Sequence, residues 1–256
     1  MVFNDQQMLR YARHIVLPEV GGAGQAKLLD ASVLVVGAGG LGSPLLLYLA
    51  AAGVGRLGIV DDDTVDLSNL HRQIAHPTDH VGLAKTTSAK RAAAALNPDI
   101  EVVLHAERLT PDNAATIIQD YDLVADGSDN FATRDTVHGT CFSLRKPLIS
   151  AAVQGVEGQL STFKAHLGPP HPCYRCVFPE TPPADLIPSC AEGGVLGPVV
   201  GVMGSLQAVE VVKELLGRGE SLSGTLLLYD GLSTAFRRIS VDRRTSCSIC
   251  NDYCMV

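Results

Sequence analysis

The sequence predicts an α/β protein of Rossmann type, with a mostly parallel sheet that helices cover on both faces. Short apolar runs alternate with segments of helical periodicity over residues 33–152, which is the pattern of parallel strands joined by helices. One junction, residues 33–42, passes from an apolar strand through Gly37, Gly39 and Gly42 into a helix. Such a turn brings backbone N–H groups and a helix N-terminus close to a phosphate. By itself it indicates a nucleotide without identifying the chemistry.

The first segment of the chain is expected to be helical. Asn4 or Asp5 can begin this helix, because their side chains accept hydrogen bonds from the free N–H groups of a first turn. Its apolar side consists of Met8, Leu9, Ala12 and Ile15. A turn and a short helix that ends at Asp30 then lead to the first strand.

The strands and helices of the core follow from the apolar pattern. Strands are expected where apolar and β-branched residues run together, at 33–37, 57–60, 100–105, 122–126 and 148–152. Helices are expected at 43–52, 84–96, 111–119 and 131–145. Gly53 and the pair Asn97-Pro98 supply the stop signals for the first two helices. Crossover connections between the parallel strands should be right-handed.

The pattern changes after Gln154. Residues 158–165 and 224–241 predict strands of an antiparallel edge or lobe, and the apolar run that begins at Val195 predicts a buried helix. Between them, residues 168–188 contain seven prolines, and so long a loop in a compact domain is usually functional or anchored. We expect one domain over residues 1–256, with a nucleotide-binding core at about 30–153 and a second part at about 154–256.

Composition excludes several classes of protein. With 46% hydrophobic and 18% charged residues, the chain of 256 residues has an ordinary globular composition. The net charge of −7 argues against a nucleic-acid-binding surface. The N-terminus lacks the pattern of a secretory signal, and glycines, Gln207 and Glu210 interrupt the longest apolar run, so no membrane span is expected. We expect a soluble, cytoplasmic protein.

Polar residues gather after the second strand. Asp61 occupies the position at which a Rossmann-type site binds a ribose hydroxyl; a solvated acidic turn is the alternative. Asn69 and Arg72 lie three residues apart, and Lys85 begins the next helix. Two cations beside a pyrophosphate-binding turn suit a triphosphate whose leaving group gains charge. Surface cations without a role are the alternative.

The end of the fourth strand offers carboxylates at the same edge of the sheet. Asp126 and Asp129 are both candidates for Mg²⁺, which prefers oxygen ligands, and Asp129 is the first choice. Either carboxylate could instead cap the helix that starts near Phe131.

The most specific motif is a set of two C-x-x-C pairs: Cys173 with Cys176, and Cys247 with Cys250. Four thiolates predict a closed, structural Zn²⁺ site, which would anchor the proline-rich loop to the C-terminal tail. A redox dithiol and two local disulfides are the alternatives. The histidines beyond the turn are interpreted as surface or capping residues: His71, His76 and His80.

Cys190 stands apart from these pairs, just before the helix expected from Val195. A thiol near a helix N-terminus has a lowered pKa and is a better nucleophile, whereas an inert buried cysteine is the alternative. Cys141 and Cys254 are interpreted as a packing residue and a tail residue.

Taken together, these motifs resemble the ThiF/MoeB/HesA family, the bacterial relatives of ubiquitin-activating enzymes. The resemblance extends from Arg10 to Cys250, almost end to end. The residues that carry it are Arg10-Tyr11-Ala12-Arg13, the glycine turn at 37–42, Ser68-Asn69-Leu70-His71-Arg72-Gln73, Asp129-Asn130, Cys173-Tyr174-Arg175-Cys176 and Gly204-Ser205-Leu206-Gln207-Ala208.

The resemblance implies an adenylyltransferase that uses ATP and Mg²⁺. A ubiquitin-like sulfur-carrier protein ending in Gly-Gly would present its C-terminal carboxylate to the α-phosphate, forming an acyl-adenylate and releasing pyrophosphate. In this scheme Gly40 approaches the phosphates, Asp61 holds the ribose and Asp129 positions Mg²⁺. The nucleotide-binding set that it implies is Gly40, Asp61, Ser68, Asn69, Leu70, His71, Arg72, Lys85, Asp129 and Asn130.

The resemblance also implies partners. Arg13 matches an arginine that reaches the nucleotide of the other subunit, which implies a homodimer. Cys190 matches the cysteine that joins the carrier through an acyl persulfide in ThiF-like members and is not needed in MoeB-like members. The sulfur donor is then expected to be a separate sulfurtransferase or cysteine desulfurase.

Two other functions compete with this interpretation. A nicotinamide-dependent dehydrogenase would need a separate acid–base constellation, and it leaves Arg72, Lys85 and the paired cysteines unexplained. A non-catalytic zinc-containing adaptor would have no reason to keep the phosphate-binding residues.

Overall fold

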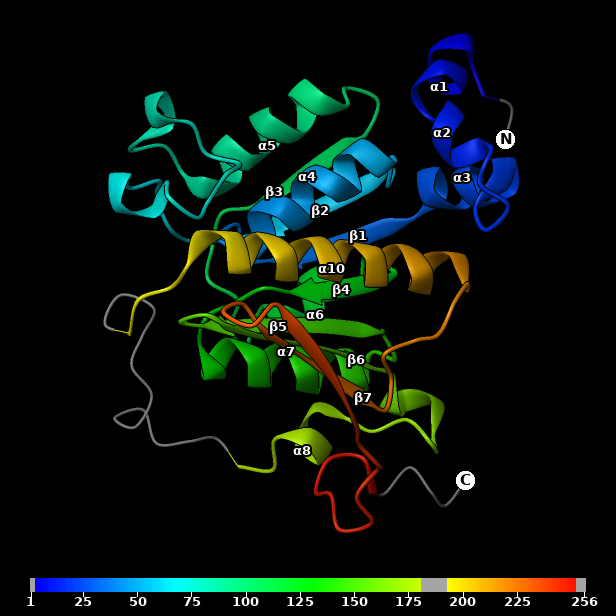
Figure 1. Ribbon diagram of the computed structural model, residues 1–256, viewed down its shortest axis with the longest axis vertical. Coiled ribbons are helices and arrows are strands. Elements are labelled where there is room, and N and C mark those ends of the chain that lie inside the picture. The colour runs from blue at the N-terminus through cyan, green and yellow to red at the C-terminus, as the bar shows by residue number, and fades with distance from the viewer. Residues whose placement is uncertain (1–2, 181–192, 252–256) are drawn as a thin grey trace.

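In a computed structural model, the strands of the described residues form one eight-stranded sheet with the strand order β3-β2-β1-β4-β5-β6-β7-β8 (Figure 1). The structure describes residues 3–180 and 193–251, so Cys190 and Cys254 lie outside the described residues. The strands are β1 (Ser32–Val36), β2 (Arg56–Val60), β3 (Glu101–His105), β4 (Leu123–Asp126), β5 (Leu148–Gln154), β6 (Glu157–Phe163), β7 (Thr225–Asp230) and β8 (Ala235–Ser240).

The first five strands are parallel, as the sequence predicts. β1 pairs with β2 on one side and with β4 on the other. The strands from β1 to β3 are therefore added on one side of β1 and the later strands on the other side, so the strand order reverses at β1. In open α/β sheets a ligand binds outside the carboxyl ends of the strands at this point. The topology therefore places a site above the ends of β1 and β4.

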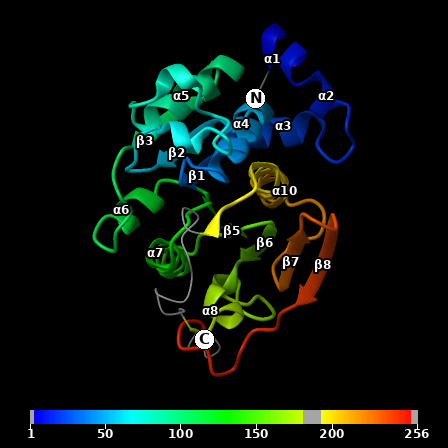
Figure 2. The same ribbon diagram turned by 60° about the vertical axis from the view of Figure 1, so that its left-hand side comes forward.

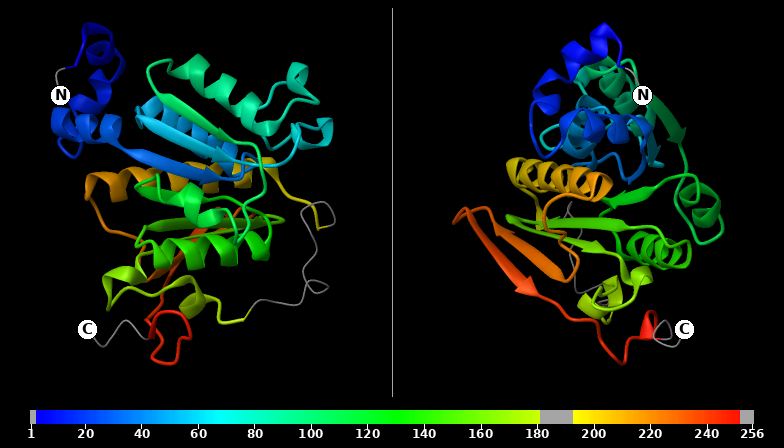
Figure 3. Two further views of the ribbon diagram at one scale, coloured as in Figure 1. Left: turned by 180° about the vertical axis from the view of Figure 1, so that it is seen from behind. Right: turned by 90° about the vertical axis from the view of Figure 1, so that its right-hand side faces the viewer.

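Helices cover both faces of the sheet (Figure 3). Val33 and Val35 of β1 belong to one apolar cluster with α3, α4, α5 and α10. Leu34 and Val36 belong to the other, with α6 and α7, because successive side chains of a strand point to opposite faces. The helices are α1 (Asp5–Arg10), α2 (Ala12–Ile15), α3 (Gly21–Asp30), α4 (Gly42–Ala52), α5 (Lys85–Leu96), α6 (Ala114–Ile118), α7 (Phe131–Ser143), α8 (Tyr174–Val177) and α10 (Gly197–Leu216). Short 3₁₀ turns lie at Leu67–Asn69, Thr78–His80 and Ala165–Leu167.

The N-terminal helix is divided in two at Tyr11, and only the second half of its predicted apolar side, Ala12 and Ile15, is partly buried. Asn4 caps α1 as expected, accepting a hydrogen bond from the Gln7 N–H. However, Met8 is 46% and Leu9 is 80% exposed, whereas Tyr11 is buried. The apolar surface of α1 is therefore not covered by its own chain.

The glycine turn needs glycine for space. A Cβ at Gly42 would lie 1.8 Å from the Gly37 carbonyl oxygen, and Gly37 itself has a φ of +90°. Gly53 ends α4 in the left-handed conformation, with a φ of 81°, as its position in the sequence predicts.

The antiparallel strands extend the edge of the main sheet, so the predicted antiparallel edge is confirmed and the alternative of a separate lobe is wrong. The segment predicted at 224–241 is a hairpin of β7 and β8, and β6 joins it to β5. Figure 2 shows this hairpin at the opposite end of the sheet from β3. Among the described residues, no helix is both long and apolar enough to cross a membrane.

α10, the helix expected from Val195, ties the two halves of the sheet together. Gln207 is buried on α10, and its Nε2 donates hydrogen bonds to the carbonyl oxygens of Asp126, at 2.9 Å, and Ile149, at 3.0 Å. These carbonyls belong to β4 and β5, so Gln207 holds together the strands whose carboxyl ends border the site.

Candidate functional site

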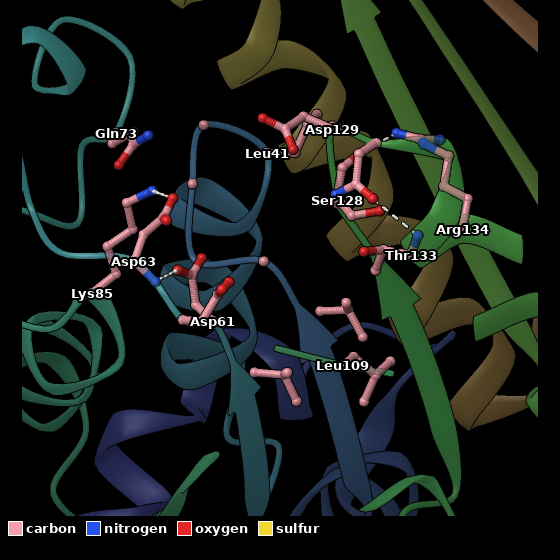
Figure 4. A pocket seen from close by; sticks show the side chains of 18 of the residues that line it. Leu41, Asp61, Asp63, Gln73, Lys85, Leu109, Ser128, Asp129, Thr133 and Arg134 are labelled. Carbon is pink, nitrogen blue, oxygen red and sulfur yellow. Dashed lines mark hydrogen bonds and ion pairs between the residues drawn. The ribbon is translucent and has the colours of Figure 1, made fainter. Parts of the chain in front are cut away.

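A pocket lies above the carboxyl ends of β1, β2 and β4 (Figure 4). The glycine turn forms its floor, and charged side chains from four different segments surround it. The residues that line it with polar groups or glycine backbone include Gly37, Gly39, Gly40, Asp61, Asp62, Asp63, Arg72, Gln73, Lys85, Arg108, Ser128, Asp129, Asn130 and Arg134. The location agrees with the one that strand order requires.

Both backbone polar groups of Ala38 anchor the glycine turn. Its N–H donates to Asp61 Oδ2 at 2.8 Å, and its carbonyl lies 2.8 Å from His76 Nε2. His76 is 4% exposed, and its Nδ1 lies 2.8 Å from the hydroxyl of Ser88. The interpretation of His76 as a surface residue is therefore wrong, because its imidazole bridges the turn and α5. Periodicity could not reveal this role, since the partners are 38 and 12 residues away.

Asp61 is half-buried and presents its carboxylate to the pocket. Its other oxygen, Oδ1, accepts a hydrogen bond from the Asp63 N–H at 2.9 Å. Burial raises the pKa of Asp61, although nearby Lys85 and the two backbone N–H groups favour the charged form. Each carboxylate oxygen can accept more than one hydrogen bond, so Asp61 can still receive a ligand hydroxyl. Its position is consistent with the predicted ribose contact.

Lys85 begins α5 and is buried, at 6% exposed. Its Nζ lies 2.7 Å from Asp63 Oδ2. The sequence indicated the lysine but not this partner, although three consecutive aspartates at 61–63 were a visible signal. A ligand phosphate would thus compete with Asp63 for the ammonium group.

Arg72 also lines the pocket, and its neighbours hold it in place. Its Nη2 donates to Asn69 Oδ1 at 3.0 Å and its Nη1 to the Ser68 carbonyl at 3.2 Å. Gln73 donates to the same Asn69 oxygen at 3.0 Å, and its own Oε1 is buried without a hydrogen-bond partner. Within the predicted nucleotide-binding set, four residues do not line the pocket: Ser68, Asn69, Leu70 and His71.

The two aspartates at the carboxyl end of β4, Asp126 within it and Asp129 just beyond it, have different environments. Asp126 is buried, and its carboxylate accepts hydrogen bonds from the Ser128 N–H at 2.9 Å and the Ser150 hydroxyl at 3.0 Å. Asp129 is exposed and lines the pocket. Asn130 caps α7 through the Thr133 N–H, so neither aspartate is the cap. This geometry favours Asp129 over Asp126 as the carboxylate available to a cation.

Some predicted residues are not part of this pocket in a single chain. Arg13 is exposed on α2 and does not line it, and its predicted role in another subunit stays a prediction. Conversely, the sequence interpretation missed Arg134, which lines the pocket and is only 7% exposed. Its one sequence signal was a basic residue in the first turn of a helix, where negative charge is normally favoured.

The four paired cysteines come together as predicted. Cys173 Sγ lies 3.5 Å from Cys247 Sγ, and Cys176 Sγ lies 3.5 Å from Cys250 Sγ. Within the first C-x-x-C pair, the Sγ atoms of Cys173 and Cys176 are 3.8 Å apart. Four sulfurs bound to Zn²⁺ at about 2.3 Å in a tetrahedron are separated by about 3.8 Å, whereas a disulfide needs about 2.0 Å. The four thiols therefore fit a single zinc ion and not two local disulfides.

The four cysteines share one buried environment. All four side chains are buried, and the cluster joins α8 to the C-terminal segment. Burial, and then the nearby thiol of Cys176, raise the pKa of Cys173. Four thiolates can coexist here only with a cation among them.

The fold and this pocket define an α/β protein of Rossmann type with a glycine-rich turn at the pocket floor and a four-cysteine cluster. Comparison with known proteins then identifies the family. The chain belongs to the ThiF family, whose model matches residues 11–249. The sequence interpretation of the family is thus confirmed.

Named relatives are similar over nearly the whole chain. The adenylyltransferase and sulfurtransferase MOCS3 of Culex quinquefasciatus is 49% identical over 97% of this chain, which spans 56% of that protein. The sulfur carrier protein adenylyltransferase of Thermus thermophilus is 48% identical over 98% of this chain and 94% of its own length. The chain therefore spans about half the length of the MOCS3 relatives that it matches.

Solved structures agree on the fold. E. coli MccB with AMPCPP and MccA superposes with a TM-score of 0.81, at 25% identity, over 94% of this chain and 74% of that chain. PaaA superposes with a TM-score of 0.80, at 22% identity, over 95% of this chain and 76% of that chain.

Proposed function

We propose that this protein is an ATP-dependent adenylyltransferase, which activates the C-terminal Gly-Gly carboxylate of a ubiquitin-like sulfur-carrier protein. The observation that carries the proposal is the convergence of Arg72, Lys85, Asp61 and Asp129 on the glycine turn. Two cations and a hydroxyl-accepting carboxylate match a nucleoside triphosphate. Relatives 48–49% identical to this chain are named as adenylyltransferases, which supports the same activity.

In the proposed reaction, the carrier supplies the nucleophile. One oxygen of its carboxylate forms a bond to the α-phosphorus of ATP. The bond from that phosphorus to the leaving oxygen breaks, and its electron pair departs with pyrophosphate. No side chain needs to act as a nucleophile or base, so the residues contribute charge stabilisation and positioning. Arg72 and Lys85 would stabilise the negative charge that grows on the leaving pyrophosphate.

The turn would position the nucleotide for this attack. Gly40 would face the phosphates, and Asp61, held by the Ala38 N–H, would accept a ribose hydroxyl. Lys85 would exchange its contact with Asp63 for the nucleotide, so binding would replace an existing ion pair and not neutralise an isolated charge.

Two metal ions complete the proposal. Asp129, exposed on the pocket lining, would position the Mg²⁺ that accompanies ATP and neutralises its phosphates. Zn²⁺ would occupy the four-cysteine cluster, where its role is structural because all four coordination positions are filled by protein. It would fix the proline-rich segment to the C-terminal segment.

A second cavity supports a peptide-like partner. It lies over β5 and β6 beside the nucleotide pocket and shares four of its lining residues: Asp129, Asn130, Val153 and Arg134. Its walls include Tyr174, Phe178 and Leu228 together with the backbone of Gly158. We propose that the carrier tail lies along this cavity and that the C-terminal part, residues about 154–256, binds the carrier.

The chain would act as a homodimer in the cytoplasm. Arg13 is exposed on α2, next to the exposed apolar side chains of α1. If a partner subunit covers this surface, Arg13 would reach the nucleotide that the partner subunit binds. Cys190 would form the acyl persulfide adduct if the chain works as ThiF does, with a separate sulfurtransferase or cysteine desulfurase as donor.

ATP–pyrophosphate exchange tests the proposed function. Exchange should require MgATP and a carrier that ends in Gly-Gly, and the same carrier without these two glycines is the matched control. The Cys190→Ala variant should keep exchange, because the proposed role of Cys190 comes after adenylation. No exchange with any carrier of this type, or hydride transfer with a nicotinamide cofactor, would contradict the proposal.

A further inference from the structure

Arg134 is a buried cation in an unfavourable local position. It is the fourth residue of α7, which begins at Phe131, and it is 7% exposed. The first turn of a helix carries partial positive charge, so a cation there is destabilising. Burying a guanidinium also costs hydration. Helix stability therefore gives no reason for an arginine at this position.

The contacts of Arg134 orient its guanidinium without neutralising it. Nη2 donates to the carbonyl oxygens of Ser128 and Ala151, the latter at 3.0 Å, and Nη1 lies 3.4 Å from the Ser150 hydroxyl. That hydroxyl donates to Asp126, so Asp126 is separated from the guanidinium by Ser150. Within residues 3–180 and 193–251, no carboxylate forms a salt bridge with Arg134.

The guanidinium also has donors to spare. Arginine carries five N–H groups in a fixed fork, and the contacts of the described residues account for three of them. Carbonyl and hydroxyl acceptors hold the fork in one orientation. Both N–H groups of Nη2 are used, so the donors left are Nε–H and one N–H of Nη1, which lie on different edges of the guanidinium. A carboxylate oxygen is the acceptor that suits such a donor best, because a charge-assisted hydrogen bond is stronger than one to a neutral group.

Arg134 lies where the two cavities meet. It lines both the nucleotide pocket and the second cavity over β5 and β6. Figure 4 shows its side chain on the side of Ser128 and Asp129 that is remote from Lys85 and Asp63. A peptide that enters from the second cavity therefore meets Arg134 before it reaches the cations Arg72 and Lys85.

We propose that Arg134 binds the C-terminal carboxylate of the incoming peptide tail and delivers it to the α-phosphate. This inference rests on the proposed function and adds a catalytic residue to it. The reaction joins two anions, and a buried cation at the junction offsets their repulsion. Arg134 stays protonated throughout, because the new P–O bond forms and the old one breaks without a proton transfer.

Discrimination between a carboxylate and an amide tests this contact directly. The probe is a Gly-Gly-ending carrier compared with the same carrier ending in a carboxamide, with binding measured in the presence of a non-hydrolysable ATP analogue. The unchanged protein should prefer the carboxylate by on the order of tenfold to 100-fold. Arg134→Gln should abolish that preference, and Arg134→Lys should retain part of it, because lysine keeps the charge but not the contacts that orient the guanidinium.

Kinetics and controls separate this role from a structural one. In Arg134→Gln, kcat/KM for the carrier should fall on the order of 100-fold, while the affinity for ATP without carrier stays within about twofold. Arg56→Gln is the matched control, since Arg56 is the first residue of β2, at the end of the strand away from the pocket, where it bonds to the Asp120 carbonyl and Glu101. It should leave the preference for the carboxylate unchanged.

Three results would overturn the inference. One is a preference for the carboxylate that survives in Arg134→Gln. A second is an equal loss of ATP affinity, which would assign Arg134 to the nucleotide or to the loop at Ser128. The third result applies if Arg134→Gln does not fold. It is an Arg134→Lys variant that prefers the carboxylate over the carboxamide carrier as strongly as the unchanged protein does. Failure of the proposed function is a separate outcome, because the unchanged protein would then give no exchange.

Discussion

Replacing Gly40 by alanine should strain the glycine turn against α10. A Cβ at this position would lie 2.8 Å from Val200 Cγ1, well inside ordinary contact distance. Gly40 is not among the glycines with positive φ, so alanine can adopt its backbone conformation and the obstacle is steric. Val200 is 3% exposed and cannot swing into solvent. Overpacking of this kind costs about 1–3 kcal/mol, which sets the expected loss of stability in Gly40→Ala.

A double-mutant cycle identifies the obstacle. Val200→Ala removes the clashing methyl group and by itself should cost about 1–3 kcal/mol through lost burial and a cavity. In Gly40→Ala/Val200→Ala the new methyl group enters the vacated space, so the two costs should not add. We expect a favourable coupling of about 1–2 kcal/mol.

The assay is urea unfolding of all four proteins at pH 7 with matched zinc content. ATP binding, measured calorimetrically, should fall in Gly40→Ala and recover in the double variant, because the turn regains its position. Costs that add within about 0.5 kcal/mol would refute the reasoning, since Val200 would then not be what excludes a side chain at position 40.

Three further predictions address the charged site, the cysteine cluster and pH. Arg72→Ala should lower exchange on the order of 100-fold to 1,000-fold with thermal stability nearly unchanged, since the hydrogen bonds of Arg72 to Ser68 and Asn69 join only residues of one short segment; normal exchange would show that Arg72 is not part of the site. Cys247→Ser should lower the zinc content from one per chain, measured by atomic absorption, and lower Tm by several degrees; unchanged zinc and Tm would contradict a structural metal. Burial, and then Arg175, lower the pKa of His138 to about 4, so the unfolded chain, with a histidine pKa near 6.5, binds the proton more tightly. Stability should therefore fall as pH drops from 7 to 5, by about 2 kcal/mol from this residue. His138→Leu should show that much less acid sensitivity in urea unfolding, and an identical pH dependence would show that His138 does not titrate in this way.

Local signals predicted most of the core elements. The β-branched runs, the stop signals at Gly53 and Asn97-Pro98, and the glycine turn gave strands and helices whose ends differ by a few residues from those observed. The predicted helix at 111–119 is shorter, Ala114–Ile118, because Asn113 bonds back to the Thr110 N–H and keeps the preceding residues in a turn.

Long-range contacts were beyond the reach of these signals. The bridge from His76 to Ala38, the pairing of Lys85 with Asp63 and the burial of Arg134 all depend on which segments the fold brings together. No spacing rule connects such residues, because their separation in sequence has no fixed relation to their separation in space.

The sequence by itself determined the fold class, the glycine-rich turn, the two C-x-x-C pairs and, through its motifs, the family. These features are local, since each depends on residue types within one turn, strand or helix. Only the tertiary structure decided that the antiparallel strands extend the main sheet, that Asp129 and not Asp126 faces the pocket, and that Arg134 lies between two cavities. Those outcomes depend on how strands pair and which side chains become buried, because burial and hydrogen bonding act between segments that the chain brings together only when it folds.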